Sequence, residues 1–278
     1  IVGAVALMAT MIGFSDIGSA TAEETVRVCS GEPGLNYTGL VGEIKKAIEA
    51  DSPIVTIENI ETLGSRESAE RYNAGECDAF MSQPEAASET DATAAFEAWP
   101  EYTHMLCNTE LVDGADSMSE LIDLDKVVQV GGAPTGSGSR DTLDFWATNY
   151  PDDYGEHNFK FMDIAPEQAI GLMLKGTLPC TFFVSGLRPD YMSVLNTPAA
   201  AEKITMINFD NYNLDNAEGY NDEQIDSGVY GELNGWSDLD SVRVSSSFYI
   251  RPNLDTTKPI AYLVLSNLGG QVAAKYRE

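Results

Sequence analysis

The sequence predicts a two-lobed α/β fold, and three observations lead to this fold class. A β-α-β-α-β pattern runs over residues 25–82 and is repeated over residues 126–185. In each unit a helix ends at a glycine, Gly75 or Gly176, shortly before a cysteine and a phenylalanine. Strands that alternate with helices are typical of largely parallel sheets covered by helices. Two such units in series predict two lobes.

The doubled pattern also predicts how the chain divides. We expect lobe one near residues 24–104 plus 227–278 and lobe two near residues 105–226, with the segment Glu101–Leu111 as the link. Each lobe is expected to have a sheet of its own. The carboxyl ends of parallel strands and the N-termini of helices would meet between the lobes, which is where α/β sheets bind ligands.

Individual elements are predicted from hydrophobic period and from turn residues. The expected strands are residues 25–30, 54–60, 78–82, 126–131, 159–164, 181–185, 201–209 and 241–251. The expected helices are residues 37–50, 67–74, 140–149, 167–174 and 257–277, the last with a break at Gly269-Gly270. Residues 210–226 are polar and rich in Asn and Asp, so they are expected to be loop.

The N-terminal segment has the pattern of a signal peptide. Ile1–Phe14 is apolar and uncharged, and small residues ending in Ala20-Thr21-Ala22 follow it. The apolar stretch is shorter than the roughly 20 residues that span a membrane, and an Ala-x-Ala site is where a signal peptide is cleaved. We expect residues 1–22 to be a signal peptide with a truncated n-region, and the mature chain to be periplasmic or otherwise extracytoplasmic.

The charge balance excludes some functions. The 278 residues carry 44 acidic and 16 basic side chains, a formal net charge of −28. Nucleic-acid binding depends on Lys and Arg at the phosphates, so we expect no nucleic-acid partner. The acidity itself is typical of a heavily solvated surface.

Four cysteines, Cys29, Cys77, Cys107 and Cys180, permit disulfides in an exported chain, with three possible pairings. Parallel strands would place Cys29 and Cys77 at opposite ends of a sheet, which predicts that these two do not bridge. There is no C-x-x-C motif and the chain has 2 histidines, so no metal site and no cofactor are expected.

Polar residues between strands and helices are the candidate ligand contacts of lobe one. Ser30, Asn36 and Tyr37 lie in or just after the turn that follows the first strand, and Ser65 precedes the second helix. Gln83 follows the third strand. Glycines and helix N-termini in such turns suit an anionic ligand group. A plain turn, or helix capping by Ser65, explains the same residues without a ligand.

Lobe two offers a similar set. Gly136-Ser137-Gly138-Ser139 opens a helix and Arg140 follows, while Ser185 ends a strand. Backbone and hydroxyl donors at a helix start form a nest for a carboxylate or oxyanion. Arg140 would add a bidentate contact if it points inward; the alternative is that it pairs with an aspartate of its own helix.

No catalytic motif is present. The sequence contains neither G-x-S-x-G nor H-E-x-x-H, and the glycine-rich run at 136–139 is not followed by the Lys-Ser/Thr of a phosphate-binding loop. We therefore expect a binding protein and not an enzyme.

The order of these motifs resembles the TAXI family, the solute-binding proteins associated with TRAP transporters, over roughly Val26–Phe209. The matching residues are Gly34-Leu35-Asn36-Tyr37; Thr62, Gly64, Ser65, Glu67, Gly75, Asp78, Ala79 and Gln83; Val130-Gly131 with Gly136-Ser137-Gly138-Ser139; and Phe182-Phe183-Val184-Ser185-Gly186-Leu187.

The resemblance implies a type 2 periplasmic binding protein fold and a receptor that delivers a small amino acid or carboxylate to membrane transporter subunits. Two alternatives stay open. One is a receptor for phosphate or another oxyanion, which needs only donors in its site. The other is an exported enzyme on the same scaffold, with a pair of carboxylates in the cleft.

Overall fold

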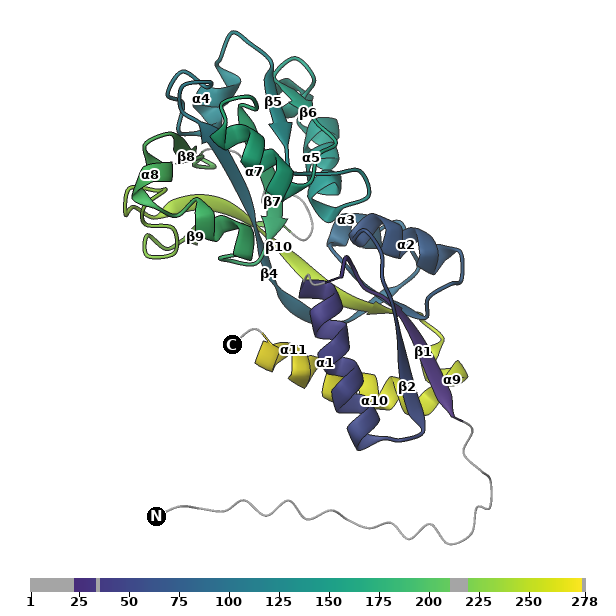
Figure 1. Cartoon of the computed structure of the whole chain (residues 1–278). Coiled ribbons are helices and arrows are strands. Elements are labelled where there is room, and N and C mark those ends of the chain that lie inside the picture. The colour runs from purple at the N-terminus through teal and green to yellow at the C-terminus, as the bar shows by residue number, and fades with distance from the viewer. Residues whose placement is uncertain (1–22, 34–35, 211–219, 277–278) are drawn as a thin grey trace, which may run out of the picture.

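The computed structural model of the chain describes residues 23–33, 36–210 and 220–276. These residues form two α/β lobes that are joined by two long strands (Figure 1). No helix within these ranges is both long and apolar enough to cross a membrane. The predicted signal peptide, residues 1–22, lies outside the described residues.

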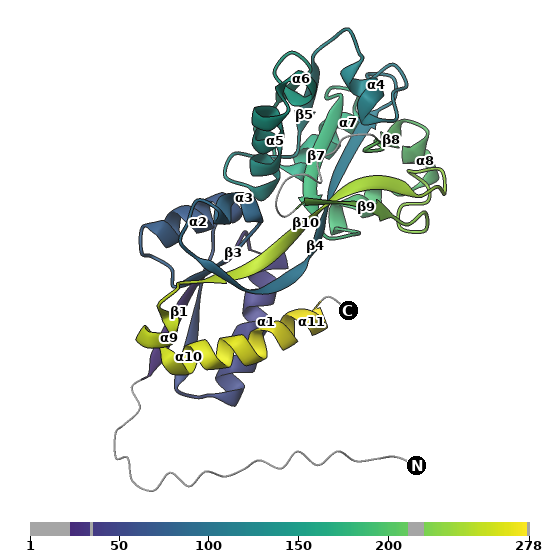
Figure 2. The ribbon, with the colours of Figure 1, turned by 180° about the vertical axis from the view of Figure 1, so that it is seen from behind.

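Lobe one is built on a parallel sheet in which β1 pairs with both β2 and β3. Its elements are β1 (Glu24–Cys29), α1 (Asn36–Asp51), β2 (Val55–Ile60), α2 (Ser65–Asn73), β3 (Ala79–Ser82), α3 (Pro84–Ala87), α9 (Leu254–Thr257), α10 (Pro259–Val264), a π-helical turn (Leu265–Gly269) and α11 (Gly270–Tyr276). Leu40, Ile44 and Ile48 lie on one face of α1 and are buried in the lobe core. From behind, α10 and α11 run along this lobe, and α11 lies beside α1 (Figure 2).

Lobe two repeats the pattern, with β5 parallel to both β6 and β7. Its elements are α4 (Met118–Ile122), β5 (Val128–Gly131), α5 (Gly138–Asn149), α6 (Pro151–Tyr154), β6 (Phe159–Phe161), α7 (Pro166–Leu174), β7 (Cys180–Ser185), a 3-10 helix (Asp190–Val194), α8 (Pro198–Ala201), β8 (Ile204–Met206) and β9 (Tyr220–Ile225). Trp146 of α5 is fully buried and packs edge-on against Phe182 of β7. Aromatic burial of this kind supplies much of a core's stability.

The two lobes do not have separate sheets. Strands β4 (Thr93–Asn108) and β10 (Leu239–Ile250) are long enough to take part in both lobes. One hydrogen-bonded path therefore runs through the molecule in the order β2-β1-β3-β10-β4-β7-β5-β6. The expectation of two sheets was wrong because a single strand can pair with different partners along its length: β4 pairs with β10 first and with β7 later.

The C-terminal third differs in three places from the elements and the lobe division that the sequence predicts. Residues 220–225 form strand β9 rather than loop, because they pair with β10 although their sequence is polar. Residues 201–209 contain a short strand, Ile204–Met206, after the end of a helix. Tyr230 and Leu233 pack in a core with Phe183 of β7, so this part of the segment assigned to lobe one packs with lobe two.

The cysteines form two bridges, Cys29–Cys77 and Cys107–Cys180. Cys107 and Cys180 are direct neighbours across the antiparallel β4–β7 pair. The prediction that Cys29 and Cys77 cannot bridge was wrong. Cys77 lies in the loop between α2 and β3, before the first residue of β3, so the strand direction does not set its position. The Cα atoms of Cys29 and Cys77 lie 5.8 Å apart.

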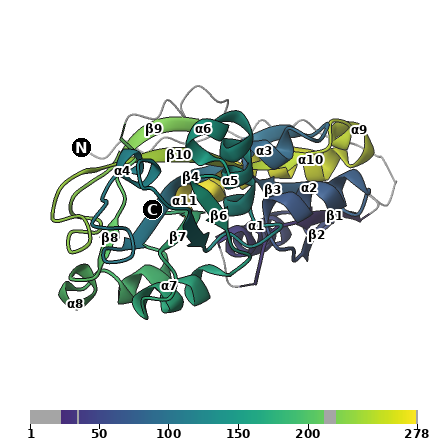
Figure 3. The same ribbon diagram turned by 90° about the horizontal axis from the view of Figure 1, so that it is seen from above.

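The lobes also touch beside the crossing strands. Helices α2 and α3 of lobe one contact α5 of lobe two. Seen from above, α3 lies next to α5 (Figure 3). The lobes therefore meet at α5 as well as along the crossing strands, so the space between them is bounded on more than one side.

Candidate functional site

A cavity of ≈ 680 Å³ lies between the lobes. Lobe one lines it with the turn after β1, the start of α2 and the end of β3, and lobe two with the starts of α5 and α7 and the end of β7. The carboxyl ends of parallel strands and the N-termini of helices from both lobes thus border the same cavity, which is where α/β units place them. The volume is within the range of small-molecule sites, about 300–1,000 Å³.

Most of the sequence-predicted residues line this cavity. They are Asn36, Tyr37, Ser65, Gln83, Ser137, Ser139 and Ser185. Ser30 does not: it is fully buried beneath the first turn, where its hydroxyl lies 3.3 Å from that of Thr38. Gly34 and Leu35, part of the matching first turn, lie outside the described residues.

The serine hydroxyls mainly hold the walls of the cavity in place. Ser137 caps α5 by accepting from the N–H of Arg140 at 3.2 Å. Ser139 accepts from the N–H of Val184 at 2.9 Å, which ties α5 to β7. Ser65 accepts from the N–H of Gln83 at 3.1 Å, which ties α2 to the end of β3. Hydroxyl bonds of this kind fix the geometry of the groups beside them.

Two helix N-termini from different lobes meet at the cavity. Gly64, directly before α2, has φ +134°, and a Cβ there would lie 3.5 Å from Cα of Ser137. Among the described residues, the N–H groups of Gly138 and Ser139 have no backbone acceptor, since the capping bonds at Ser137 begin with Arg140. Free N–H groups and helix dipoles at this point suit a carboxylate.

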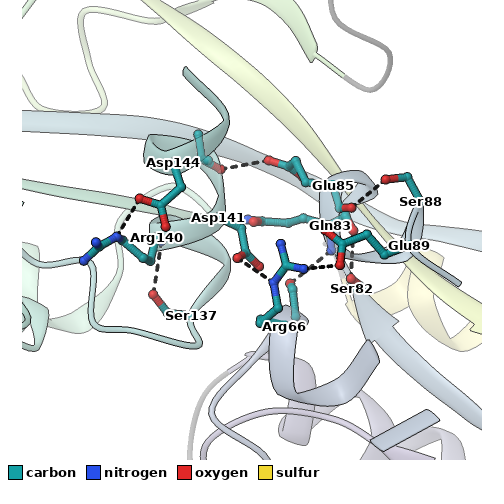
Figure 4. Close-up of polar contacts among 12 residues, drawn as sticks. Arg66, Ser82, Gln83, Glu85, Ser88, Glu89, Ser137, Arg140, Asp141 and Asp144 are labelled. Atoms are coloured by element: carbon teal, nitrogen blue, oxygen red, sulfur yellow. Dashed lines mark hydrogen bonds and ion pairs between the residues drawn. The ribbon is translucent and has the colours of Figure 1, made fainter. Parts of the chain in front are cut away.

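Arg140 does not enter the cavity. Its Nε donates to Asp144 at 2.8 Å, and its guanidinium lies over the ring of Phe161. In Figure 4 the side chain points away from Gln83. Of the two orientations that the sequence left open, Arg140 takes the outward one and pairs with an aspartate of its own helix, so it is not among the lining residues as a ligand contact would require.

Replacing Arg140 with alanine is therefore expected to change ligand affinity by less than about twofold, because its side chain does not reach the cavity. The exposed ion pair with Asp144 contributes about 1 kcal/mol at most, and that contribution is to folding and not to ligand binding. Isothermal titration of the variant beside the wild-type chain measures this. A tenfold or larger loss would show that the guanidinium reaches the ligand.

Arg188, which is not among the sequence-predicted residues, lines the cavity instead. It is exposed, its N–H donates to the Tyr230 hydroxyl at 2.7 Å, and its guanidinium donates to the Gly228 carbonyl at 3.0 Å. The signal was present in the sequence, because Arg188 lies three residues after Ser185 in the turn that follows β7. Four acidic side chains were also missed; they are Glu32, Glu101, Glu167 and Asp190.

Glu101 is the buried member of this acidic set, with 6% of its surface exposed. It lies on β4, one of the two strands that cross between the lobes. Its Oε2 accepts from Gln83 Nε2 at 2.7 Å and from the Ser246 hydroxyl at 2.5 Å. Burial raises the pKa of this carboxyl above its usual value, and the hydrogen bonds oppose that effect in part.

A second polar cluster joins the lobes away from the cavity lining (Figure 4). Arg66 of α2 pairs with Asp141 of α5 at 2.9 Å and also contacts Glu89. Glu85 of α3 accepts from Thr142 of α5 at 3.0 Å and from the Tyr220 hydroxyl of β9. These contacts join α2 and α3 of lobe one to lobe two. Within the described ranges, no group of three or more His, Cys, Asp or Glu side chains is placed to hold a metal ion.

Comparisons with known proteins support the fold. No family model matches the chain, and no curated protein is significantly similar in sequence. A protein of Bordetella bronchiseptica RB50 is 14% identical with a TM-score of 0.54, over 89% of this chain and 70% of that one. The AvGluR1 ligand-binding domain, solved with alanine, is 10% identical with a TM-score of 0.54, over 92% of this chain and 94% of that one.

YhfZ from Shigella flexneri is 10% identical with a TM-score of 0.51, over 91% of this chain and 88% of that one. Likeness at such low identity concerns the arrangement of the chain and not its chemistry. The resemblance to the TAXI family stays a prediction. The chain has a two-lobed α/β fold that it shares with the AvGluR1 ligand-binding domain, with a cavity between its lobes.

Proposed function

We propose that the protein is an extracytoplasmic solute-binding protein, without catalytic activity, that captures a small amino acid or other carboxylate and delivers it to a membrane transporter. The observation that carries this proposal is the interlobe cavity, which is lined by helix N-termini of both lobes. A ligand held by both lobes stabilises their closed arrangement, and a closed form is a signal that a partner can recognise.

The cavity wall supports an organic solute rather than an inorganic oxyanion. Its polar donors include the N–H groups at the start of α5 and the Arg188 side chain. Apolar surface is present as well, from Leu63, Phe183 and Leu187. A carbon skeleton needs such walls, whereas phosphate needs donors alone. The acidic side chains of the wall repel a dianion.

Two further points support an amino acid and a transporter. The AvGluR1 domain, which shares the fold, was solved with alanine. The motif order resembles TAXI proteins, whose ligands pass to TRAP transporters. The predicted signal peptide supports an extracytoplasmic location.

A thermal-shift screen of the purified chain against amino acids, dicarboxylates and oxyanions tests this function. A true ligand at about 100 times its dissociation constant is expected to stabilise the folded state by about 2.7 kcal/mol. Mass spectrometry of the incubated ligand is expected to recover it unchanged. Turnover of the ligand would favour the alternative of an exported enzyme, and the absence of any stabilising solute would count against the proposal.

A further inference from the structure

The turn after β7 holds Arg188 in a backbone conformation that the local sequence disfavours. Arg188 has φ +56°, in the left-handed region that residues with a side chain seldom adopt. Pro189 follows directly, and the residue before a proline is pushed toward extended backbone with negative φ. Contacts from elsewhere in the fold must therefore hold this turn. Because Arg188 lines the cavity, the same contacts also set the shape of the cavity wall.

The segment between β9 and β10 supplies these contacts. The N–H of Arg188 donates to the Tyr230 hydroxyl at 2.7 Å, and the Arg188 guanidinium donates to the Gly228 carbonyl at 3.0 Å. Tyr230 has 1% of its surface exposed, so it is held rigidly in the core of lobe two. Both the backbone and the side chain of Arg188 are thus tied to a buried segment about 40 residues further along the chain.

The Tyr230 hydroxyl is bound in turn by His104 of β4, which is fully buried. His104 Nε2 lies 3.0 Å from the Tyr230 hydroxyl, and Nδ1 lies 2.8 Å from the carbonyl oxygen of Tyr102. A carbonyl can only accept, so Nδ1 carries the proton of the neutral ring and Nε2 accepts from Tyr230. Burial lowers the pKa of His104 to about 4, so the ring is neutral at neutral pH. Each donor in the series from Arg188 to Tyr102 is therefore assigned.

The ring of His104 supports the same wall a second time. It stacks on Phe183 with ring centroids 4.9 Å apart and an interplanar angle of 16°. Phe183 lines the cavity and meets Tyr191, another lining residue, edge-on at 4.9 Å. His104 thus fixes the wall of lobe two both through Phe183 and through the Tyr230 hydroxyl, from a strand that crosses between the lobes.

We infer that Tyr230 and His104 are positioning residues for the solute site, which hold the Arg188 turn in place as a preformed part of the cavity wall. Neither residue lines the cavity itself. A wall that is fixed before binding reduces the free energy that the solute must spend on ordering it, and affinity rises accordingly. This effect on affinity rests on the proposed solute-binding function, whereas the positioning of the turn does not.

Nitrogen NMR of the wild-type chain labelled at histidine tests the hydrogen-bond series without any variant. The chain has 2 histidines, so the spectrum holds two sets of ring signals, and the exposed His157 serves as the reference. The His104 ring is expected to carry its proton on Nδ1 at about pH 7. A proton on Nε2 instead would overturn the inference, because Nε2 could then not accept from the Tyr230 hydroxyl.

Hydrogen exchange of the Arg188 amide measures how firmly the turn is held. Tyr230→Phe keeps the buried ring but removes the hydroxyl, and it is expected to speed this exchange about tenfold or more, because the N–H loses its acceptor. The matched control Tyr72→Phe removes a hydroxyl that donates to Asp91 in lobe one at 2.8 Å, and Arg188 is expected to exchange as in the wild type.

Variants of His104 separate the hydrogen bond from packing. His104→Phe keeps a ring against Phe183 but removes the acceptor, and it is expected to speed Arg188 exchange as Tyr230→Phe does. His104→Gln keeps an acceptor for the Tyr230 hydroxyl and is expected to restore slower exchange. Unchanged exchange at Arg188 in folded Tyr230→Phe would contradict the positioning role. If that variant does not fold, the wild-type NMR spectrum and the two His104 variants decide.

Isothermal titration with alanine and with glutamate measures the consequence for binding. The solute that binds the wild-type chain is expected to bind Tyr230→Phe about tenfold more weakly, and to bind Tyr72→Phe as tightly as the wild type. Unchanged affinity together with faster exchange would show that the Arg188 turn is not part of the solute site. If neither solute binds the wild-type chain, the proposed function loses support, and the NMR and exchange measurements still decide whether Tyr230 and His104 hold the turn.

Discussion

Replacing both Cys107 and Cys180 with alanine is expected to lower the free energy of unfolding by about 4 kcal/mol. The bridge closes a loop with a sequence separation of 73 residues, and opening a loop of that length returns conformational entropy to the unfolded chain. Both residues are fully buried in the pair of strands that joins β4 to lobe two. The two residues are direct cross-strand neighbours, with their Cα atoms 4.1 Å apart.

Urea unfolding of the oxidised wild-type chain and of the double variant measures this effect. Removing the Cys29–Cys77 bridge in the same way is the matched comparison, and a similar loss of about 4 kcal/mol is expected because the entropy depends only on the logarithm of loop length. Reductant opens both bridges of the wild-type chain, so it is expected to lower the free energy of unfolding by more than the removal of either bridge alone. A double variant of Cys107 and Cys180 with an unchanged urea midpoint would contradict the prediction.

Replacing Glu85 with glutamine is expected to stabilise the protein by up to about 3 kcal/mol above pH 7 and to leave it nearly unchanged near pH 4. Burial raises the pKa of Glu85 from its ordinary 4.5 to about 7, and the carboxylates of Asp141 and Glu101 add to this. Its Oε2 is buried without a partner among the described residues. The neutral carboxyl therefore suits the contact between the lobes better than the charged one.

The direction with pH follows from the raised value. Below pH 4.5 the carboxyl is neutral in both the folded and the unfolded chain, so its contribution is fully present. Between pH 4.5 and about 7 the unfolded chain loses the proton first, and the contribution is lost as pH rises. Glutamine stays neutral throughout and removes this dependence.

Urea unfolding at a series of pH values from 4 to 8 compares Glu85→Gln with the wild-type chain. The control is Glu58→Gln, an exposed position on β2, which is expected to follow the wild-type curve. Equal pH dependence in wild type and Glu85→Gln would show that Glu85 is ionised in the folded protein at neutral pH.

The sequence alone predicted the repeated units because their signals are local. Hydrophobic period and glycine stops depend on residues a few positions apart, and α1 and α2 begin and end within two residues of their expected bounds. Most candidate residues could be predicted to lie close together for the same local reason. A polar residue that directly follows a parallel strand lies at the carboxyl-end edge of the sheet, whatever the rest of the fold is.

Features that depend on distant partners were not predictable from the sequence. Glu101 is one acidic residue among 44, and nothing near it in the sequence distinguishes it. Its environment comes from Tyr37 of α1, Gln83 between β3 and α3, and Ser246 of β10. Likewise, polar strand β9 exists because β10 lies beside it.

Local sequence therefore determined the two α/β units, the strand-to-helix turns and the edge at which a ligand would lie. The tertiary structure decided the continuous sheet, the disulfide pairing and the charge of the cavity wall. The physical reason is that periodicity and turn residues act over one or two helical turns, whereas burial, desolvation and ion pairing depend on groups that meet only after the chain has folded.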